Sequence, residues 1–405
     1  MKNLIVGQSG GPTAAINSSL AGVIKAGVES ENIGKVFGMV NGILGMMERQ
    51  IIDLDPLGND DGKIKLLQKS PASFLGSCRY KMPADDTAVY EKVFEILEEY
   101  NIGYFFYIGG NDSMDTAAKL SKYAKEHNKD IKFVGVSKTI DNDLPEMDHT
   151  PGFGSAAKYI AATVREVATD AGVYAAKSVE IIEVMGRDAG WLAGSSVLAG
   201  IGGLGPDLIY MPERPFDLDK FYSDISEKFK VKNHVLIVVS EGIRTKDGKY
   251  ICDVVASLTT DAFGHKQLGG TAKIIEGLVK QRFGVKVRGI ELNTPQRCAS
   301  HILSKTDIEE AFNVGYTAVK EALCGKTGVV IAIKRVSNDP YKVTYEAVDV
   351  AKVANEARTV PDDYINERGN FVTEKFIQYV KPLVEGEIYP EFENGLPKFL
   401  VLGTE

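Results

Sequence analysis

The sequence contains little cysteine, histidine and tryptophan. Its 405 residues include four cysteines, five histidines and one tryptophan. Cys78, Cys252, Cys298 and Cys324 form no Cys-x-x-Cys pair, so we expect neither a zinc site nor a disulfide framework. A few scattered cysteines are typical of a reducing compartment, and we expect a cytoplasmic protein.

Long hydrophobic runs and runs of positive charge are also missing. No apolar stretch approaches the roughly 18 residues that cross a bilayer, and the first one, Leu4–Val6, is too short for a signal peptide. Lys and Arg total 47 against 55 Asp and Glu, a formal net charge of −8. We therefore expect no membrane partner and no nucleic acid partner, although a few placed cations and helix N-termini can still bind an anion locally.

The chain is long enough for more than one domain. A content of 44% hydrophobic and 25% charged residues is typical of globular proteins, and at about 150 residues per domain the length fits two or three domains. Pro and Gly near Thr150–Gly154 mark a boundary. We expect one domain over residues 1–152, a second over 153–296, and returning segments with a C-terminal extension over 297–405. After Ser337 we expect helices with a C-terminal strand or tail.

Short β-rich runs alternate with helical patterns along the chain. This alternation predicts an α/β fold of parallel sheets with helices on both faces. Strands are expected over residues 3–6, 104–108, 132–136, 178–184, 207–211, 234–239, 286–292 and 328–333. Helices are expected over residues 14–27, 87–100, 113–126, 155–172, 217–230, 271–283 and 308–323.

Glycine pairs follow two of the predicted strands and precede helices. The first is Gly10–Gly11; the second is Gly109–Gly110, followed by Asn111, Asp112 and Ser113. Glycine lets the backbone approach a ligand, and a helix N-terminus attracts phosphate. Because ligands bind beyond the carboxyl ends of strands in such sheets, the two turns can hold two ends of one polyphosphate. The alternatives are tight turns without a ligand and helix capping by the polar residues.

Two carboxylates and a lysine follow the predicted strand at 132–136. Asp141 and Asp143, spaced two residues apart, are expected on one side of an extended segment. A carboxylate there can take a proton from a hydroxyl or help to hold Mg²⁺ through water. Lys138 can neutralise a phosphoryl group. A solvated acidic turn is the alternative.

An arginine and a glutamate follow two later strands. Arg187 comes after the strand at 178–184 and a glycine, a place that suits an anion-binding arginine. An internal salt bridge to Asp188 or Glu183 is the alternative. Glu241 follows the strand at 234–239, where it can accept hydrogen bonds from sugar hydroxyls or cap a helix.

Taken together, these turns resemble the phosphofructokinase family. The matching segments run in order from residue 1 to about residue 335: SGGPTAAIN (9–17), FLGSCR (74–79), GGNDS (109–113), KTIDND (138–143), EVMGRDAGW (183–191), SEG (240–242) and RGIELNTPQR (288–297). The resemblance implies two doubly wound, Rossmann-like parallel-sheet lobes, the first binding the phosphoryl donor and the second the sugar phosphate. It also implies Mg²⁺-assisted phosphoryl transfer to the 1-hydroxyl of fructose 6-phosphate, by a homodimer or homotetramer.

The resemblance also implies roles for individual residues. The general base matches Asp141, with Thr139 and Asp143 matching beside it. The donor-binding positions match Gly10, Gly11, Arg79, Asn111 and Ser113. The substrate-binding positions match Thr139, Asp141, Met185, Gly186, Arg187, Glu241, Arg288, Thr294 and Arg297. Arg288 and Arg297 resemble two arginines that grip the 6-phosphate, one usually from a neighbouring subunit.

Two positions resemble the pyrophosphate-dependent branch of the family. ATP-dependent members usually carry glycine where this chain has Asp112 and Lys138. A carboxylate about 4 Å from the α-phosphate of ATP costs on the order of 4 kcal/mol at an effective dielectric near 20, about three decades in affinity. Lys138 would offset charge on the leaving phosphate. Pyrophosphate is therefore the expected donor, and since orthophosphate leaves, the reaction should be readily reversible.

Some positions depart from the family pattern. Asn111 stands where many members have an aspartate that helps to hold Mg²⁺, so Asn111 and Asp112 are the expected metal ligands. Thr294 stands where several ATP enzymes have a sugar-contacting histidine. No nucleotide effector site is identifiable, and we expect no allosteric control by nucleotides. The alternatives are an ATP-dependent enzyme, one directed to sedoheptulose 7-phosphate, and a non-catalytic regulatory subunit.

Overall fold

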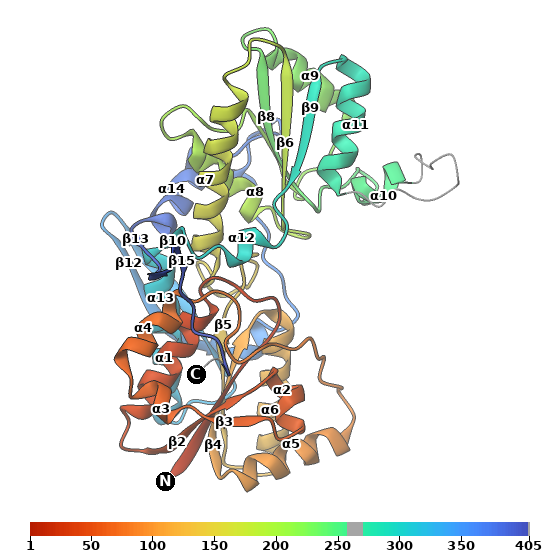
Figure 1. Ribbon diagram of the computed structural model, residues 1–405. Coiled ribbons are helices and arrows are strands. Elements are labelled where there is room, and N and C mark those ends of the chain that lie inside the picture. Colours follow the sequence, from red (N-terminus) through yellow and green to blue (C-terminus); the bar gives the residue numbers. More distant parts are fainter. Residues whose placement is uncertain (257–269, 404–405) are drawn as a thin grey trace. The chain divides into compact units, whose positions relative to one another are not determined.

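The computed structural model describes residues 1–256 and 270–403 (Figure 1). The chain forms two compact units. The first unit comprises Met1–Ser155, Arg297–Arg358 and Leu383–Glu405, and the second comprises Ala156–Gln296 and Thr359–Pro382. Residues 297–405, expected as returning segments with a C-terminal extension, are shared between the two units.

The first unit is built around a seven-stranded sheet in the order β12-β11-β5-β4-β1-β2-β3. Its strands are β1 (Lys2–Gln8), β2 (Ile33–Met39), β3 (Ile51–Asp53), β4 (Ile102–Gly109), β5 (Lys132–Ser137), β11 (Val329–Asn338) and β12 (Tyr341–Asp349). Its helices are α1 (Ile16–Val28), α2 (Gly42–Met47), α3 (Asp55–Gly58), α4 (Asp61–Lys69), α5 (Thr87–Glu99), α6 (Asn111–Glu126) and α13 (Lys305–Leu323). The smaller elements are β10 (Leu303–Ser304), β13 (Glu387–Ile388), β14 (Phe392–Glu393), β15 (Leu396–Pro397) and the 3₁₀ turn Val350–Lys352. The 3₁₀ turn Lys381–Val384 contains a boundary between the two units.

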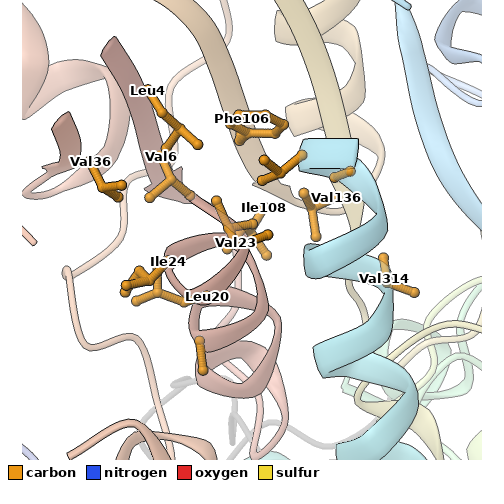
Figure 2. Close-up of a cluster of buried hydrophobic side chains, with 14 of the residues drawn as sticks. Leu4, Val6, Leu20, Val23, Ile24, Val36, Phe106, Ile108, Val136 and Val314 are labelled. Atoms are coloured by element: carbon orange, nitrogen blue, oxygen red, sulfur yellow. The ribbon is translucent and has the colours of Figure 1, made fainter. Parts of the chain in front are cut away.

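Alternate side chains of the central strands enter two cores on opposite faces of this sheet. Leu4 and Val6 of β1 pack with residues of α1, α4 and α13 (Figure 2). Ile5 packs with residues of α2, α5 and α6. Figure 1 shows the two groups of helices on the two sides of the strands. The expected layering with helices on both faces is confirmed, because a strand alternates its side chains with a period of two residues.

Helices α1 and α13 approach each other through glycines. A Cβ added at Gly22 would lie 2.0 Å from the carbonyl oxygen of Phe312, and one at Gly315 would lie 2.0 Å from that of Ser19. The two backbones therefore touch directly, and only residues without a side chain fit at the contact.

The second unit is built around a four-stranded, all-parallel sheet in the order β7-β8-β6-β9. Its elements are β6 (Ser178–Val184), α8 (Trp191–Ser195), the 3₁₀ turn Ser196–Gly200, β7 (Leu208–Tyr210), α9 (Leu218–Lys228), β8 (His234–Ser240), α10 (Ile251–Ala256), α11 (Thr271–Phe283), β9 (Lys286–Glu291), the 3₁₀ turn Asp362–Tyr364 and α14 (Glu374–Val380). Apolar residues of β6 and β8 pack with α9 and α11. Helix α7 (Phe153–Ala171) begins in the first unit and continues in the second, and α12 (Pro295–Cys298) contains a further boundary between the units.

Three expectations about the fold need correction. The first sheet is mixed, because β3 and β12 pair antiparallel at its two edges. The segment after Ser337 begins with the nine-residue strand β12 and not with a helix. The strand β2 and the helix α4 were not expected. Among the described residues, no helix has the length and apolar character that crossing a membrane requires.

Candidate active site

The carboxyl ends of β1 and β4 lie side by side in the first sheet. After β1 the chain continues to β2 on one side, and after β4 it continues to β5 and β11 on the other side. Ligands of open α/β sheets bind where the strand order reverses in this way. The two glycine pairs therefore lie beyond the carboxyl ends of these central strands, where a ligand site is expected.

The Gly10–Gly11 turn is fixed from three directions. Gly10 has φ +77°, a left-handed conformation that favours glycine. Its N–H donates to the carbonyl oxygen of Cys78, 3.1 Å away, and the Ser77 hydroxyl donates to its carbonyl oxygen at 2.7 Å. The ammonium of Lys138 donates to the carbonyl oxygen of Gly11 at 2.6 Å. The Lys138 ammonium thus binds the backbone of the predicted donor turn.

Lys138 is buried and has charged neighbours of both signs. Only 2% of the residue is exposed. Burial lowers the pKa of Lys138 to about 8; Asp141 and Asp143 act against this shift, and Arg297 and Arg79 add to it. A guanidinium nitrogen of Arg297 comes within 3.3 Å of the Cβ position of Gly11. The first unit therefore brings three cations and two carboxylates to the glycine turn, a set that can bind a polyphosphate.

Helix α6 starts directly after the second glycine pair. Its N-cap, Gly110, makes no side-chain cap hydrogen bond, so Asn111, Asp112 and Ser113 do not act as the N-cap. Asp112 is exposed in the first turn, whereas Ser113 is buried against Gly109. The Ser113 N–H donates to the carbonyl oxygen of Gly110 at 3.0 Å, so the N–H groups at the start of α6 that can bind an anion are those of Asn111 and Asp112.

Asn111 has one partnered and one unpartnered side-chain atom. Its Nδ2 donates to Oδ2 of Asp143 at 3.4 Å. Its Oδ1 is buried and has no hydrogen-bond partner. A buried carbonyl oxygen without a donor costs free energy unless something else binds it, and a hard cation is one such ligand.

The loop after β5 differs from the extended segment that we expected. Asn142 has φ +54°, so the chain turns between Asp141 and Asp143. The spacing argument for their common side is therefore wrong. Both carboxylates nevertheless raise the pKa of Lys138 through their charge. The turn of the chain, and not the alternation of a strand, brings them near the ammonium. The Thr139 hydroxyl accepts the Asp141 N–H at 3.2 Å and donates to its carboxylate at 3.4 Å.

A buried ionic network adjoins this loop. The two ring nitrogens of His149 lie 2.7 Å from Asp148 and 2.6 Å from Glu310. Burial alone would lower the pKa of His149, but Glu310 and Asp148 raise it to about 9, so the ring is a cation at neutral pH. Arg335 donates to Asp148 at 2.8 Å, and the Tyr341 hydroxyl donates to Glu310 at 2.7 Å. The network ties the loop to α13 and to the β11–β12 hairpin.

In the second unit, the predicted sugar-phosphate residues gather beyond β6 and β8. Gly186 has φ +126°, and its carbonyl oxygen accepts a hydrogen bond from Ser240. A Cβ at Gly242 would lie 1.9 Å from the carbonyl oxygen of Arg187, so the two loops touch. Arg187 is exposed, and Glu241 is half-buried beside it in the other loop. The neighbouring Asp188 pairs with Arg244 and not with Arg187.

A buried carboxylate lies next to these loops. Glu183 accepts the N–H of Ala272 at 2.7 Å, in the first turn of α11. Burial raises the pKa of Glu183 to about 7, and Glu291 and Glu241 add to the shift despite the hydrogen bond from Ala272. The Glu183 carboxyl group therefore gains and loses its proton near neutral pH. It was expected only as a possible salt-bridge partner of Arg187.

Arg288 lies away from the other predicted residues of the second unit. It pairs with Glu180 in the register of β9 and β6, whereas Arg187 follows the end of β6. At about 3.3 Å per residue, four residues of strand separate the two levels by roughly 13 Å. Arg288 instead contacts Asp170 at 3.3 Å. Thr294 is exposed beyond β9.

Two contributing residues were missed in the sequence. The Gln296 side chain accepts the N–H of Met185 at 3.0 Å and so orients the predicted substrate loop; its place beside Arg297 in the matching segment was a usable signal. Arg358 binds the loop that carries Asp141. Its segment matches no family motif, and no local pattern pointed to it.

Comparisons with known proteins show the family and the fold of this chain. The family model described as "Phosphofructokinase" matches residues 3–290. A relative from Halomonas elongata named pyrophosphate--fructose 6-phosphate 1-phosphotransferase is 43% identical over 98% of this chain and 95% of its own length. The crystal structure of pyrophosphate-dependent phosphofructokinase from Nitrosospira multiformis has a TM-score of 0.89 at 37% identity and covers 98% of this chain and 96% of that one.

One similar protein has a different name. A sulfofructose kinase from Alkalicoccus urumqiensis is 32% identical over 90% of this chain and 92% of its own length. Relatives at this distance therefore include an enzyme named for another sugar. The expected resemblance, together with the fold class of two α/β lobes, is confirmed. On the motif order, the fold and the near full-length matches, this chain belongs to the phosphofructokinase family.

Proposed function

We propose that this chain catalyses the reversible transfer of a phosphoryl group from pyrophosphate to the 1-hydroxyl of fructose 6-phosphate. The products are fructose 1,6-bisphosphate and orthophosphate. One observation carries the proposal: the buried ammonium of Lys138 lies beneath the Gly10–Gly11 turn, beside Asp141 and Asp143. Relatives named for this reaction align over nearly the whole chain.

Asp141 is the general base of the proposed reaction. Its carboxylate takes the proton of the sugar 1-hydroxyl, the oxygen attacks the phosphorus in line, and orthophosphate leaves. The Thr139 hydroxyl, bonded to both the backbone and the carboxylate of Asp141, fixes the direction of the base. Asp143 supports the charge of Lys138.

Lys138 and the donor turns bind pyrophosphate in this proposal. Gly10 and Gly11 let the backbone approach the donor, Asn111 and Asp112 at the start of α6 offer backbone N–H groups, and Ser113 offers its hydroxyl. Arg79 adds a cation from its exposed loop. Lys138 stabilises the charge that passes to the leaving phosphate. Asp112, exposed in the first turn of α6, is assigned the role of repelling the α-phosphate of ATP.

Enzymes of the phosphofructokinase family generally use Mg²⁺. The described residues contain no group of three or more His, Cys, Asp or Glu side chains arranged to hold a metal ion. The unpartnered Oδ1 of Asn111 and the carboxylates of Asp112 and Asp143 would hold a hard cation such as Mg²⁺. When bound, Mg²⁺ neutralises charge on the donor phosphates.

The second unit supplies the sugar-phosphate contacts of this proposal. Arg187 and the backbone of Met185 and Gly186 bind the phosphorylated sugar, and Glu241 accepts hydrogen bonds from its hydroxyls. Arg297 belongs to the first unit, where it lies beside Gly11, and is assigned to the 6-phosphate because the family pattern implies it. Thr294 contacts the sugar from the loop after β9.

We also propose that Arg288 serves the site of a neighbouring subunit, in a homodimer or homotetramer. Its place inside the β9 strand, paired with Asp170 and away from Arg187, supports this assignment. A site completed by a second copy makes assembly necessary for activity. A cytoplasmic location is proposed on the few, scattered cysteines.

A donor comparison tests the proposal. The purified chain is incubated with fructose 6-phosphate, Mg²⁺ and either pyrophosphate or ATP, and fructose 1,6-bisphosphate is measured. We expect turnover with pyrophosphate and, at equal donor concentration, about 10³-fold less with ATP. Efficient turnover with ATP would contradict the donor assignment. Activity only with sedoheptulose 7-phosphate or a sulfonated sugar would contradict the acceptor assignment.

A further inference from the structure

Arg358 holds the loop that carries the proposed base at four backbone points. Its backbone N–H donates to the carbonyl oxygen of Asp143 at 2.7 Å. Its guanidinium donates to the carbonyl oxygens of Met147 at 2.7 Å, Asp148 at 2.6 Å and Asn142 at 2.9 Å. A single residue that follows the β11–β12 hairpin thus contacts both ends of the turn at 142–148.

This turn needs such support because of its backbone conformation. Asn142 and Glu146 both have a left-handed φ, +54° and +62°. A left-handed non-glycine residue is unfavourable on its own and persists where its surroundings fix it. The turn directs several carbonyl oxygens inward, and a planar guanidinium with five N–H donors satisfies them together. Lysine offers only a flexible point charge with three donors.

The loop is held on the other side of Asp141 as well. The Thr139 N–H donates to the carbonyl oxygen of Pro151 at 3.2 Å, and the Thr150 hydroxyl donates to the carbonyl oxygen of Thr139 at 2.8 Å. Asp141 therefore lies between a segment fixed within its own loop and a segment fixed by Arg358. Removal of the Arg358 side chain takes away the contacts that fix the segment after Asp141.

We propose that Arg358 is a positioning residue for phosphoryl transfer: it fixes the turn at 142–148 and so sets the place of the Asp141 carboxylate. This inference rests on the proposed function, in which Asp141 is the base. It gives the segment after Ser337 a role in the reaction. Arg358 itself touches no substrate in this account, so its loss should lower kcat and leave the KM for fructose 6-phosphate nearly unchanged.

The test is a double-mutant cycle with Arg358→Met, Asp141→Ser and the double variant. Misplacing a reacting group by about 1 Å can cost about 10²-fold in rate, and we expect this loss of kcat for Arg358→Met. The Asp141→Ser variant should lose about 10²- to 10⁴-fold. Because positioning is of no use without the base, the double variant should be no slower than Asp141→Ser alone.

Two further variants separate positioning from folding. Arg358→Lys keeps the charge and part of the hydrogen bonding, so its kcat should fall between those of the wild type and Arg358→Met. Arg49→Met is the control: Arg49 pairs with Glu95 and Glu99 at the surface, and its loss should leave kcat unchanged. If Arg358→Met does not fold, the cycle is run with Arg358→Lys.

The outcomes distinguish the inference from the proposed function. Unchanged kcat in Asp141→Ser would contradict the base itself. A large loss in Asp141→Ser with wild-type kcat in the Arg358 variants would overturn the inference alone. Losses that multiply in the double variant would also overturn it, because Arg358 would then act independently of the base.

Discussion

The ammonium of Lys138 lies 2.6 Å from the carbonyl oxygen of Gly11. This contact joins the end of β5 to the turn after β1, two parts of the chain 127 residues apart in sequence. It places a buried cation under the predicted donor turn. Because the pKa of Lys138 is lowered to about 8 by burial, its charge is lost as the pH rises through that value.

Replacing Lys138 should impair use of pyrophosphate and remove a pH dependence. We expect Lys138→Met to lower kcat by about 10²- to 10³-fold, the usual cost of one transition-state donor. In the wild type, kcat/KM for pyrophosphate should fall as pH rises through about 8, since Lys138 then loses its proton. The measurement is a profile of kcat/KM from about pH 6.5 to about pH 9.5, a range that extends roughly 1.5 units to each side of this pKa.

Lys138→Arg is the control for this prediction. Arginine keeps its charge throughout this pH range, so the fall in kcat/KM above pH 8 should disappear even if the rate is lower overall. An unchanged fall in Lys138→Arg would assign the titration to another group.

The donor preference should depend on two residues together. We expect the double variant Asp112→Gly, Lys138→Gly to use pyrophosphate poorly, because it lacks the cation at the leaving phosphate. It should bind ATP more tightly, because the carboxylate near the α-phosphate is gone. Steady-state rates with pyrophosphate measure the first effect, and isothermal titration calorimetry with each donor measures the second, with Asp112→Gly as the single-site comparison. Wild-type affinity and turnover with pyrophosphate would refute the donor argument.

His149 should stabilise the fold in a pH-dependent way. Its pKa is raised from 6.5 to about 9 in the folded chain. The stabilisation is therefore fully present below about pH 6.5 and is lost as pH rises through about 9. His149→Leu leaves buried carboxylates without this cation and should lower the free energy of unfolding by about 3 kcal/mol at pH 6.

The difference in melting temperature between wild type and His149→Leu, measured at pH 6 and pH 9.5, checks this prediction. It should shrink at the higher pH. Using the difference removes the contribution of groups that titrate in both proteins, such as Lys138. A difference that is constant with pH would mean that His149 is neutral in the folded protein.

The contact between α1 and α13 should tolerate no side chain. Gly22→Ala and Gly315→Ala each bring a Cβ within 2.0 Å of a backbone oxygen, so the helices must separate. We expect each to lower the free energy of unfolding by about 1–3 kcal/mol. Gly277→Ala in α11 is the control, since no atom lies within 4 Å of its Cβ position; it should be neutral or stabilise by up to about 1 kcal/mol. Equal melting temperatures for all three would contradict the contact.

The sequence predicted those helices and strands whose own residues show a clear hydrophobic pattern or composition. The run at Ser178–Val184 is rich in Val and Ile, and β6 has these bounds. The predicted helix at Thr271–Phe283 is likewise α11. The strand β2 was missed because its two glycines and a lysine weaken the strand pattern. In β12, apolar and charged residues alternate with a period of two, a strand signal that the high charge concealed.

The site was predictable where motifs lie at the ends of strands. Gly10, Lys138 and Asp141 were named from their places after β1 and β5, and the first unit brings them together. The left-handed turn at Asn142 could not be predicted, because its conformation depends on hydrogen bonds from residues far along the chain. Arg358 was missed for the same reason: its partners lie more than 200 residues away in sequence.

The reverse reaction tests the central claim most directly. Fructose 1,6-bisphosphate, orthophosphate and Mg²⁺ are incubated with the purified chain, and pyrophosphate is followed by ³¹P NMR, with Asp141→Ser as the inactive control. The account predicts that pyrophosphate and fructose 6-phosphate form in equal amounts with the wild type and not with the variant. Absence of pyrophosphate with the wild type, alongside turnover of ATP in the forward direction, would contradict the account.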